Sequence, residues 1–152
     1  TIGAIRNIKH ERCIVHGGTR HETLDVLLLA VANSDQYGNN ARIAPGARVD
    51  DGELDLVVVQ PVNLLGAVGI AARLFLGSID ASPHVRRMRG TRFTIERVAP
   101  GLIHTDGETH ATGAVVEVVV RPRSLRMVVP IGSTVSALVP DQVAAGFALH
   151  LP

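Results

Sequence analysis

The sequence predicts a mainly β protein, an antiparallel β-sandwich with one principal helix at about residues 63–76. Short runs rich in β-branched residues recur along the chain, and turn signals such as Gly-Gly, Pro-Gly and Asp-Gly separate them every eight to twelve residues or so. Only one stretch has apolar residues at helical spacing. With 152 residues and 46% hydrophobic content, we expect residues 1–152 to form a single domain with its own core.

The expected strands share β-branched content and flanking turn residues, and they span residues 2–8, 12–15, 24–32, 54–59, 92–98, 114–121 and 125–129. Residues 24–32 are almost continuously apolar, which is typical of a strand buried on both faces, although a helical turn remains an alternative. Residues 54–59 alternate, so Leu54, Leu56 and Val58 share one face of a strand. The tail from 131 to 152 has no strong period.

The predicted helix has Asn63 as a candidate N-cap and Gly77 as a candidate terminator. Its apolar residues recur three and four apart, at Leu64, Leu65, Val68, Ala71, Ala72 and Phe75. Gly66 and Gly69 lie on one face of this helix. We expect them to allow close packing against a sheet, with contact to a lipid chain as the alternative.

Charge and composition exclude several functional classes. Fifteen basic and fourteen acidic residues give a net charge of +1, and four aromatic residues are few for base stacking, so no nucleic-acid partner is expected. A single cysteine forms no internal disulfide and no thiolate metal cage, which favours a reducing compartment such as the cytoplasm. No apolar stretch is long enough to span a membrane.

An acidic turn is the first candidate site. Asp50, Asp51, Glu53 and Asp55 place four carboxylates within six positions around Gly52. Carboxylate and backbone oxygens converging on a turn are suited to a hard cation. A solvated hairpin turn explains the same residues, because Asp-Gly is a common turn pair.

A second acidic turn contains Asp106, Gly107 and Glu108 between His104 and His110. Carboxylates can act as the base in phosphoryl transfer and can hold metal-bound phosphates, and Gly107 permits close backbone approach to a ligand. A plain surface turn is the alternative.

Weaker candidates lack partners at the spacing their chemistry needs. They are a zinc pair at His104 and His110, a nucleophile at Cys13 with His16, a phosphate loop at residues 16–19, and an anion-binding cluster at Arg86, Arg87, Arg89 and Arg92. Exposed turn histidines and a solvated strand end explain these residues without a function.

The order of motifs resembles the C-terminal domain of the bacterial diacylglycerol kinase and sphingosine kinase superfamily of soluble lipid kinases. The motifs are residues 31–33 (Val-Ala-Asn), 37–38 (Tyr-Gly), 43–55 (from Ile-Ala-Pro-Gly to Asp-Asp-Gly-Glu-Leu-Asp), 106–108 (Asp-Gly-Glu) and 125–130 (ending in Val-Val-Pro). The resemblance covers about residues 10 to 130. One departure is Asn39-Asn40 after Gly38, where relatives carry glycines.

The resemblance implies the C-terminal β-sandwich of a two-domain, ATP-dependent kinase that transfers the γ-phosphoryl group to a lipid hydroxyl, such as that of diacylglycerol. The Gly-Gly-Asp-Gly-Thr motif of the N-terminal nucleotide-binding domain does not occur in the chain, so we expect that domain to be absent and the isolated chain to be inactive. ATP, the phosphoryl donor, would be bound mainly by that domain. A non-catalytic lipid-binding module and an NAD kinase-like phosphotransferase with a soluble substrate are alternatives.

The resemblance also assigns site residues. Magnesium would be held by the Asp51 side chain with backbone oxygens of Arg48 and Glu53, and the catalytic carboxylate would be Glu108 with Asp106 beside it. The expected partners are a lipid alcohol substrate, a transiently contacted membrane surface and the N-terminal nucleotide-binding domain, while a homodimer stays open. We expect a cytoplasmic protein that can sit at the membrane periphery.

Overall fold

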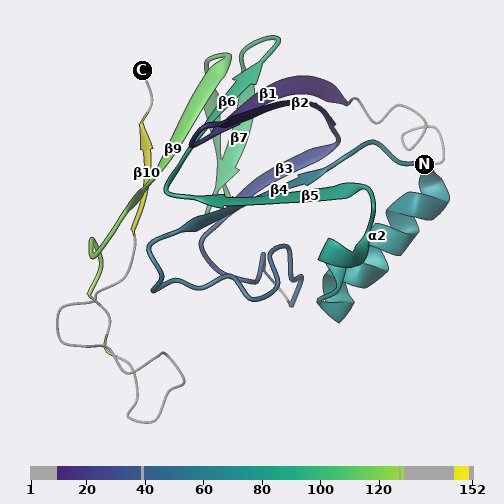
Figure 1. Cartoon of the computed structure of the whole chain (residues 1–152), viewed down its shortest axis with the longest axis horizontal. Helices are drawn as coiled ribbons and strands as arrows, with labels where there is room; N and C mark the ends of the chain where they lie inside the picture. The colour runs from purple at the N-terminus through teal and green to yellow at the C-terminus, as the bar shows by residue number, and fades with distance from the viewer. Residues whose placement is uncertain (1–9, 39, 127, 129–145, 151–152) are drawn as a thin grey trace.

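The structure is a computed structural model that describes residues 10–38, 40–126, 128 and 146–150. Its strands form antiparallel sheets, as the sequence predicted (Figure 1). The larger sheet has the order β10-β9-β6-β1-β2. Its strands are β1 (Glu11–Gly17), β2 (Arg20–Val26), β6 (Arg92–Arg97), β9 (Val115–Arg121) and β10 (Gly146–His150).

The smaller sheet has the order β3-β4-β5, from β3 (Leu28–Ala32), β4 (Leu54–Val59) and β5 (Val85–Gly90). The apolar run at 24–32 is therefore two strands in two different sheets, not one doubly buried strand. The chain changes sheets at Leu27, whose backbone N–H donates to the Val59 carbonyl at 2.9 Å. The sequence stays apolar across Leu27 because both β2 and β3 contribute side chains to a hydrophobic core.

The central strand β4 separates two hydrophobic cores, and all six of its residues are buried. Leu54, Leu56 and Val58 point into the space between the two sheets, where they pack with side chains such as Phe93. Val57 and Val59 point the other way, into a second core with Ile43, Ala44, Ile79 and Val85. The alternation read from the sequence is thus confirmed, and it serves two cores because β4 is covered on both faces.

The helix α2 (Leu64–Leu76) has the caps that the sequence predicted. The Asn63 side chain accepts a hydrogen bond from the Gly66 N–H at 2.8 Å, and Gly77 has the left-handed conformation, with φ of 65°, that suits glycine. A 3₁₀ turn, η1 (Ile79–Ala81), leads on towards β5. Among the residues that the structure describes, no helix is long and apolar enough to cross a bilayer.

The packing of α2 differs from the expectation. Ile70 and Leu74 pack against the second core, and no residue of the helix is fully buried. A Cβ atom on Gly69 would meet nothing, and one on Gly66 would meet only Val62 and Asn63 beside it, so neither glycine allows close approach to a sheet. The stripe read from the sequence faces outward instead.

A separate hairpin pairs β7 (Gly101–Thr105) with β8 (Glu108–Thr112). The guanidinium of Arg97, at the end of β6, fixes the base of this hairpin through hydrogen bonds to the Thr112 hydroxyl and to the Gly113 and Leu102 carbonyls. Buried Thr112 in turn donates to the Gly101 carbonyl at 3.3 Å. Contacts from the five-stranded sheet thereby hold the hairpin at its root.

Three predictions for the chain ends have different outcomes. The expected strand at 2–8 lies outside the described residues. Leu125, Arg126 and Val128 belong to no strand, which corrects the expectation for 125–129; the chain turns after β9 through Arg123, whose φ is 56°. β10, within the tail that showed no period, pairs with β9 along Gly146–His150.

Candidate functional site

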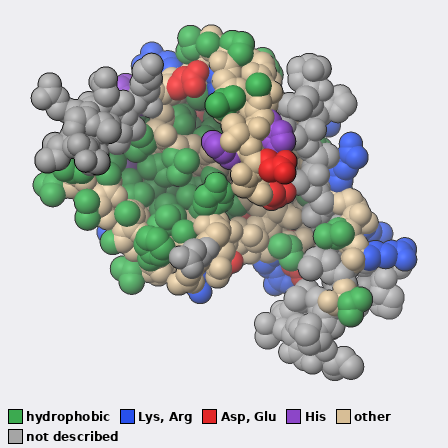
Figure 2. Space-filling view, turned by 180° about the vertical axis from the view of Figure 1, so that it is seen from behind, with side chains coloured by type: hydrophobic (Ala, Val, Ile, Leu, Met, Phe, Trp, Pro, Cys, Tyr) green, Lys and Arg blue, Asp and Glu red, His purple; other side chains and the backbone are tan. Residues whose placement is uncertain are grey.

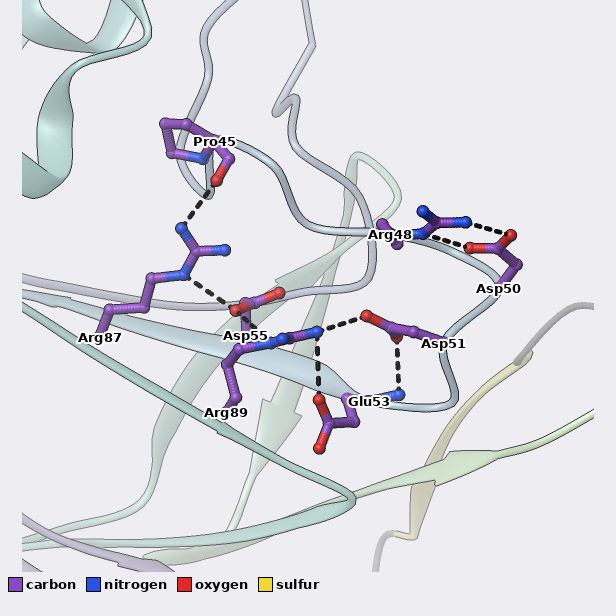
Figure 3. A network of polar contacts seen from close by, with 8 residues as sticks. All are labelled: Pro45, Arg48, Asp50, Asp51, Glu53, Asp55, Arg87 and Arg89. Carbon is purple, nitrogen blue, oxygen red and sulfur yellow. Dashed lines mark hydrogen bonds and ion pairs between the residues drawn. The ribbon is translucent and has the colours of Figure 1, made fainter. Parts of the chain in front are cut away.

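The acidic turn before β4 is a network of ion pairs (Figure 3). Arg48 and Asp50 form a bidentate pair, with Nε donating to Oδ1 at 2.9 Å and Nη2 donating to Oδ2 at 2.8 Å. This hydrogen-bonded guanidinium lowers the pKa of Asp50 from its ordinary value. Gly52 completes the turn with φ of 74°.

Arg89 on β5 is the cation at the centre of the turn. Its guanidinium contacts the Asp51 carboxylate, lies 3.1 Å from Glu53 Oε2 and 3.4 Å from Asp55 Oδ1 (Figure 3). The other Asp51 oxygen, Oδ1, accepts a hydrogen bond from the Glu53 N–H at 2.9 Å. Both oxygens of Asp51 are therefore already engaged.

The innermost carboxylate of the turn, Asp55, is 2% exposed and is paired with Arg87 at 2.9 Å. Arg87 also donates to Asp80 of η1 and to the Pro45 carbonyl, each at 2.8 Å. A buried carboxylate requires such partners, because an unpaired charge away from water is costly. Arg87 thus ties the turn, η1 and the residue 43–47 loop to β5.

These contacts bear on the predicted magnesium ligands. Arg48 and Glu53 were expected to contribute backbone oxygens with the Asp51 side chain, but Arg89 already supplies positive charge at that carboxylate. No cluster of three or more histidine, cysteine or acidic side chains suited to a metal occurs in the described part of the chain. Arginine therefore compensates the carboxylates of the turn, a magnesium ion there remains a prediction, and the chemistry proposed below does not depend on it.

The second acidic turn is the tip of the β7–β8 hairpin. Thr105 pairs with Glu108, so Asp106 and Gly107 form a two-residue turn, and their φ values of 50° and 89° correspond to the turn type that Asp-Gly favours in hairpins. Glu108 is consequently the first residue of β8. Both carboxylates are exposed, and within the described residues neither side chain has a hydrogen bond or ion pair.

The two acidic turns stay separate in the contacts that the structure describes. No hydrogen bond or ion pair among those residues joins Asp106 or Glu108 to the 48–55 turn. At the hairpin, His104 Nδ1 lies 3.1 Å from the Thr109 hydroxyl. The expected site residues therefore form two groups: a neutralised turn and a free hairpin tip.

An open hollow of about 530 Å³ lies beside the neutralised turn. Glu53, Arg89 and Arg92 line it together with residues 16–18, the segment that superficially resembles a phosphate loop. Arg92 is paired with Glu117, and His16 lies 2.9 Å from Glu96. No sequence pattern predicts that these segments come together, since they meet through the packing of the two sheets.

The weaker candidates are accounted for by the fold. Cys13 is buried, and burial raises the pKa of its thiol, which disfavours the thiolate that a nucleophile needs.

The arginine cluster is more than a solvated strand end. Three of its members form ion pairs, namely Arg87, Arg89 and Arg92, whereas Arg86 is exposed. His104 and His110 have no third ligand among the described residues.

Comparison with known proteins agrees with this architecture. Residues 1–129 match the family model described as the YegS C-terminal NAD kinase beta sandwich-like domain. The chain belongs to this family. Its YegS-type β-sandwich is thus both the observed fold and the fold that the resemblance to lipid kinases implied.

Two curated relatives of this YegS-type domain are named probable lipid kinase YegS-like. The protein from Citrobacter koseri is 26% identical over 123 residues, covering 81% of this chain and 40% of its own length. The protein from Pectobacterium atrosepticum is 38% identical over 58 residues, covering 38% of this chain and 19% of its own length. The chain thus spans less than half of the relatives that it matches.

Solved structures support the fold alone, since their identities are low. A diacylglycerol kinase from Bacillus anthracis str. Sterne overlays with a TM-score of 0.56 at 19% identity, over 74% of this chain and 41% of that protein. Another structure from that organism overlays with a TM-score of 0.60 at 21% identity, over 75% of this chain and 41% of its own. The YegS-type domain is therefore related to probable lipid kinases in sequence and to a diacylglycerol kinase in shape.

Proposed function

We propose that this domain is the C-terminal half of an ATP-dependent kinase that phosphorylates a lipid hydroxyl, with a diacylglycerol-like lipid as substrate. The names of its relatives support the lipid kinase class. Because the chain spans 40% of the Citrobacter relative, the remainder of such a kinase would supply the nucleotide-binding domain and most contacts to ATP.

The observation that carries the proposal is the free hairpin tip. Glu108 is exposed at the start of β8, without an ion pair among the described residues, and Arg97 holds the root of its hairpin. A carboxylate that is anchored through its backbone but unpaired at its side chain is available to a substrate docked against the domain. The family resemblance assigns the base to this residue.

The chemistry follows from this availability. The Glu108 carboxylate accepts the proton of the lipid hydroxyl while the hydroxyl oxygen bonds to the γ-phosphorus and ADP leaves. Asp106, one residue before Gly107, would hold the metal or contact the nucleotide. Magnesium carried with ATP would neutralise phosphate charge during the transfer.

The test is a phosphoryl-transfer assay of the full-length protein with labelled ATP. Diacylglycerol, other lipid alcohols and NAD are offered separately, and the 152-residue chain is assayed beside it. We expect label on a lipid alcohol, none on NAD, and no turnover by the chain alone. Label on NAD would favour the alternative phosphotransferase, and binding of lipid without transfer would favour a non-catalytic module.

A further inference from the structure

The helix α2 has two apolar faces, and among the described residues only one of them packs on the rest of the fold. Ile70 and Leu74 pack on the second core. At 3.6 residues per turn the opposite side of the helix carries a second apolar stripe, made of Leu64, Leu65, Val68, Ala71, Ala72, Phe75 and Leu76. These side chains are all exposed, and Leu65 and Leu76 reach 81% and 78%.

Figure 2 shows apolar side chains gathered on the side of the molecule where α2 lies. Large exposed apolar patches on a folded domain mark interaction sites, because isolated exposed apolar residues are common but contiguous ones are not. A helix that is apolar all round is ordinarily covered on all sides. We therefore expect a binding partner to cover the outer stripe of α2.

The side-chain chemistry of the stripe favours a lipid partner over a protein partner. No side chain in it can donate or accept a hydrogen bond, whereas protein interfaces carry several hydrogen bonds and favour Tyr, Trp and Arg at their centres. Contact with the hydrocarbon interior of a bilayer requires neither hydrogen bonds nor these side chains. With 13 residues α2 is about 20 Å long, too short to cross a bilayer core of about 30 Å, so it would lie flat in the interface.

Charge around the stripe favours an anionic surface. α2 contains no acidic residue and one basic residue, Arg73, in its last turn. The Arg42 side chain lies against Gly77, the C-cap, about 3.0 Å from where a Cβ would stand, and adds a second cation at that end. Cationic groups beside an apolar helical face attract acidic lipid headgroups.

We infer that the outer stripe of α2 is a docking surface for an anionic lipid bilayer, into which it inserts parallel to the membrane plane. The inference rests on the proposed function in one respect: a kinase whose substrate is a lipid alcohol must meet the bilayer that holds the substrate. The hairpin that carries Glu108 is a separate element, so docking and chemistry reside on different parts of the domain.

The test is sedimentation of the 152-residue chain with phosphatidylcholine vesicles, made with or without phosphatidylglycerol. We expect binding that increases with phosphatidylglycerol and weakens with salt. The double variant Leu65→Gln and Leu76→Gln should lower the partition coefficient about tenfold or more, because two large apolar side chains no longer enter the lipid. Arg73→Gln should lower it about fivefold on phosphatidylglycerol vesicles only.

Controls separate docking from damage. Gln is a good helix former and both leucines are exposed, so Tm should not change. The pair Val98→Gln and Val115→Gln removes two exposed apolar side chains outside α2 and should leave binding unchanged. Leu64→Gln with Val68→Gln is a second pair in the stripe and should repeat the loss.

Two results would overturn the inference: no vesicle binding, or equal binding by the wild type and both stripe variants. Dissociation of a dimer by the stripe variants, seen by sedimentation velocity without any effect on vesicles, would assign the face to a second copy instead. Vesicle binding requires no ATP. Failure of the kinase proposal would appear separately, as absent phosphorylation of a short-chain diacylglycerol presented without vesicles to the full-length protein.

Discussion

Two turns of the molecule contain the same Asp-Gly pair and treat its carboxylates differently. At 50–55 each carboxylate faces an arginine, and the innermost, Asp55, is buried. At 106–108 the carboxylates face solvent and have no ionic partner among the described residues. The ion pairs of the first turn neutralise its carboxylates and stabilise the fold. The carboxylates of the second turn are available for the chemistry that we propose for them.

Substitution of Glu108 at the hairpin should have the strongest effect on activity. In the full-length protein, Glu108→Gln keeps the shape of the side chain and removes the base, so kcat for lipid phosphorylation should fall by about 10²–10⁴-fold. The unfolding free energy should not change, because among the described residues the Glu108 side chain has no hydrogen bond or ion pair to lose. Glu22→Gln, a change at another exposed strand residue, is the matched control. A Glu108→Gln enzyme with wild-type kcat would move the base to another residue.

The reverse effect is expected at the neutralised turn. Arg87→Gln leaves the buried Asp55 with only the longer Arg89 contact, and removing one partner of a buried pair costs about 3–5 kcal/mol of unfolding free energy. Urea unfolding measures this loss. Arg86→Gln, the exposed neighbour on β5, is the control and should stay within about 0.5 kcal/mol of wild type. Equal stabilities for the two variants would contradict a structural role for the network.

Magnesium tests how fully arginine neutralises the first turn, because it would compete with Arg89 for Asp51. We expect a small rise in Tm with magnesium in the wild type and a larger one in Arg89→Gln. Full occupancy at about a hundredfold excess over Kd corresponds to about 2.7 kcal/mol. Asp51→Ala should abolish the response, and EDTA should reverse it. If magnesium leaves the Tm of both the wild type and Arg89→Gln unchanged, the turn does not bind this ion.

The smallest expected effect concerns the Arg48–Asp50 pair. Because Arg48 lowers the pKa of Asp50 in the folded state, the pair stabilises the protein above the ordinary Asp value of 3.8, and this contribution disappears as pH falls through the lowered pKa. Asp50→Asn should remove less than about 1 kcal/mol near neutral pH, and this difference should shrink as pH falls through the lowered pKa. Unfolding free energies measured over a series of pH values provide the check. A stability difference that stays the same from neutral to acidic pH would contradict this role of the pair.

Much of the fold could be predicted because local patterns and packing agree. The alternation at 54–59, the Asn63 and Gly77 caps and the Asp106-Gly107 turn each follow from rules that involve neighbouring residues. The two-sheet split of residues 24–32 could not be predicted, since the apolar run continues across Leu27 and periodicity does not show where a chain changes sheets. The outward stripe of α2 was missed for a related reason: periodicity reveals an apolar face without saying what covers it.

The site was predictable as two groups of residues and not as a network. The carboxylates of 50–55 were visible, but Arg87 and Arg89 lie more than thirty positions later on β5, and only the pairing of β4 with β5 brings them together. The register places Arg89 opposite Asp55. Strand pairing depends on the tertiary fold, so the sequence could suggest a cation at the turn but could not show that arginines of β5 pair with its carboxylates.

The change of sheet at Leu27 has a consequence for how the domain opens. One residue separates β2 from β3, and its N–H is bonded to Val59 at the end of β4. Because a single hydrogen-bonded residue links the two sheets, we expect that neither sheet can unfold while the other stays folded. Amide hydrogen exchange should therefore report one opening free energy for Leu24 and Val31, equal to that of global unfolding, and the two sheets form a single cooperative unit.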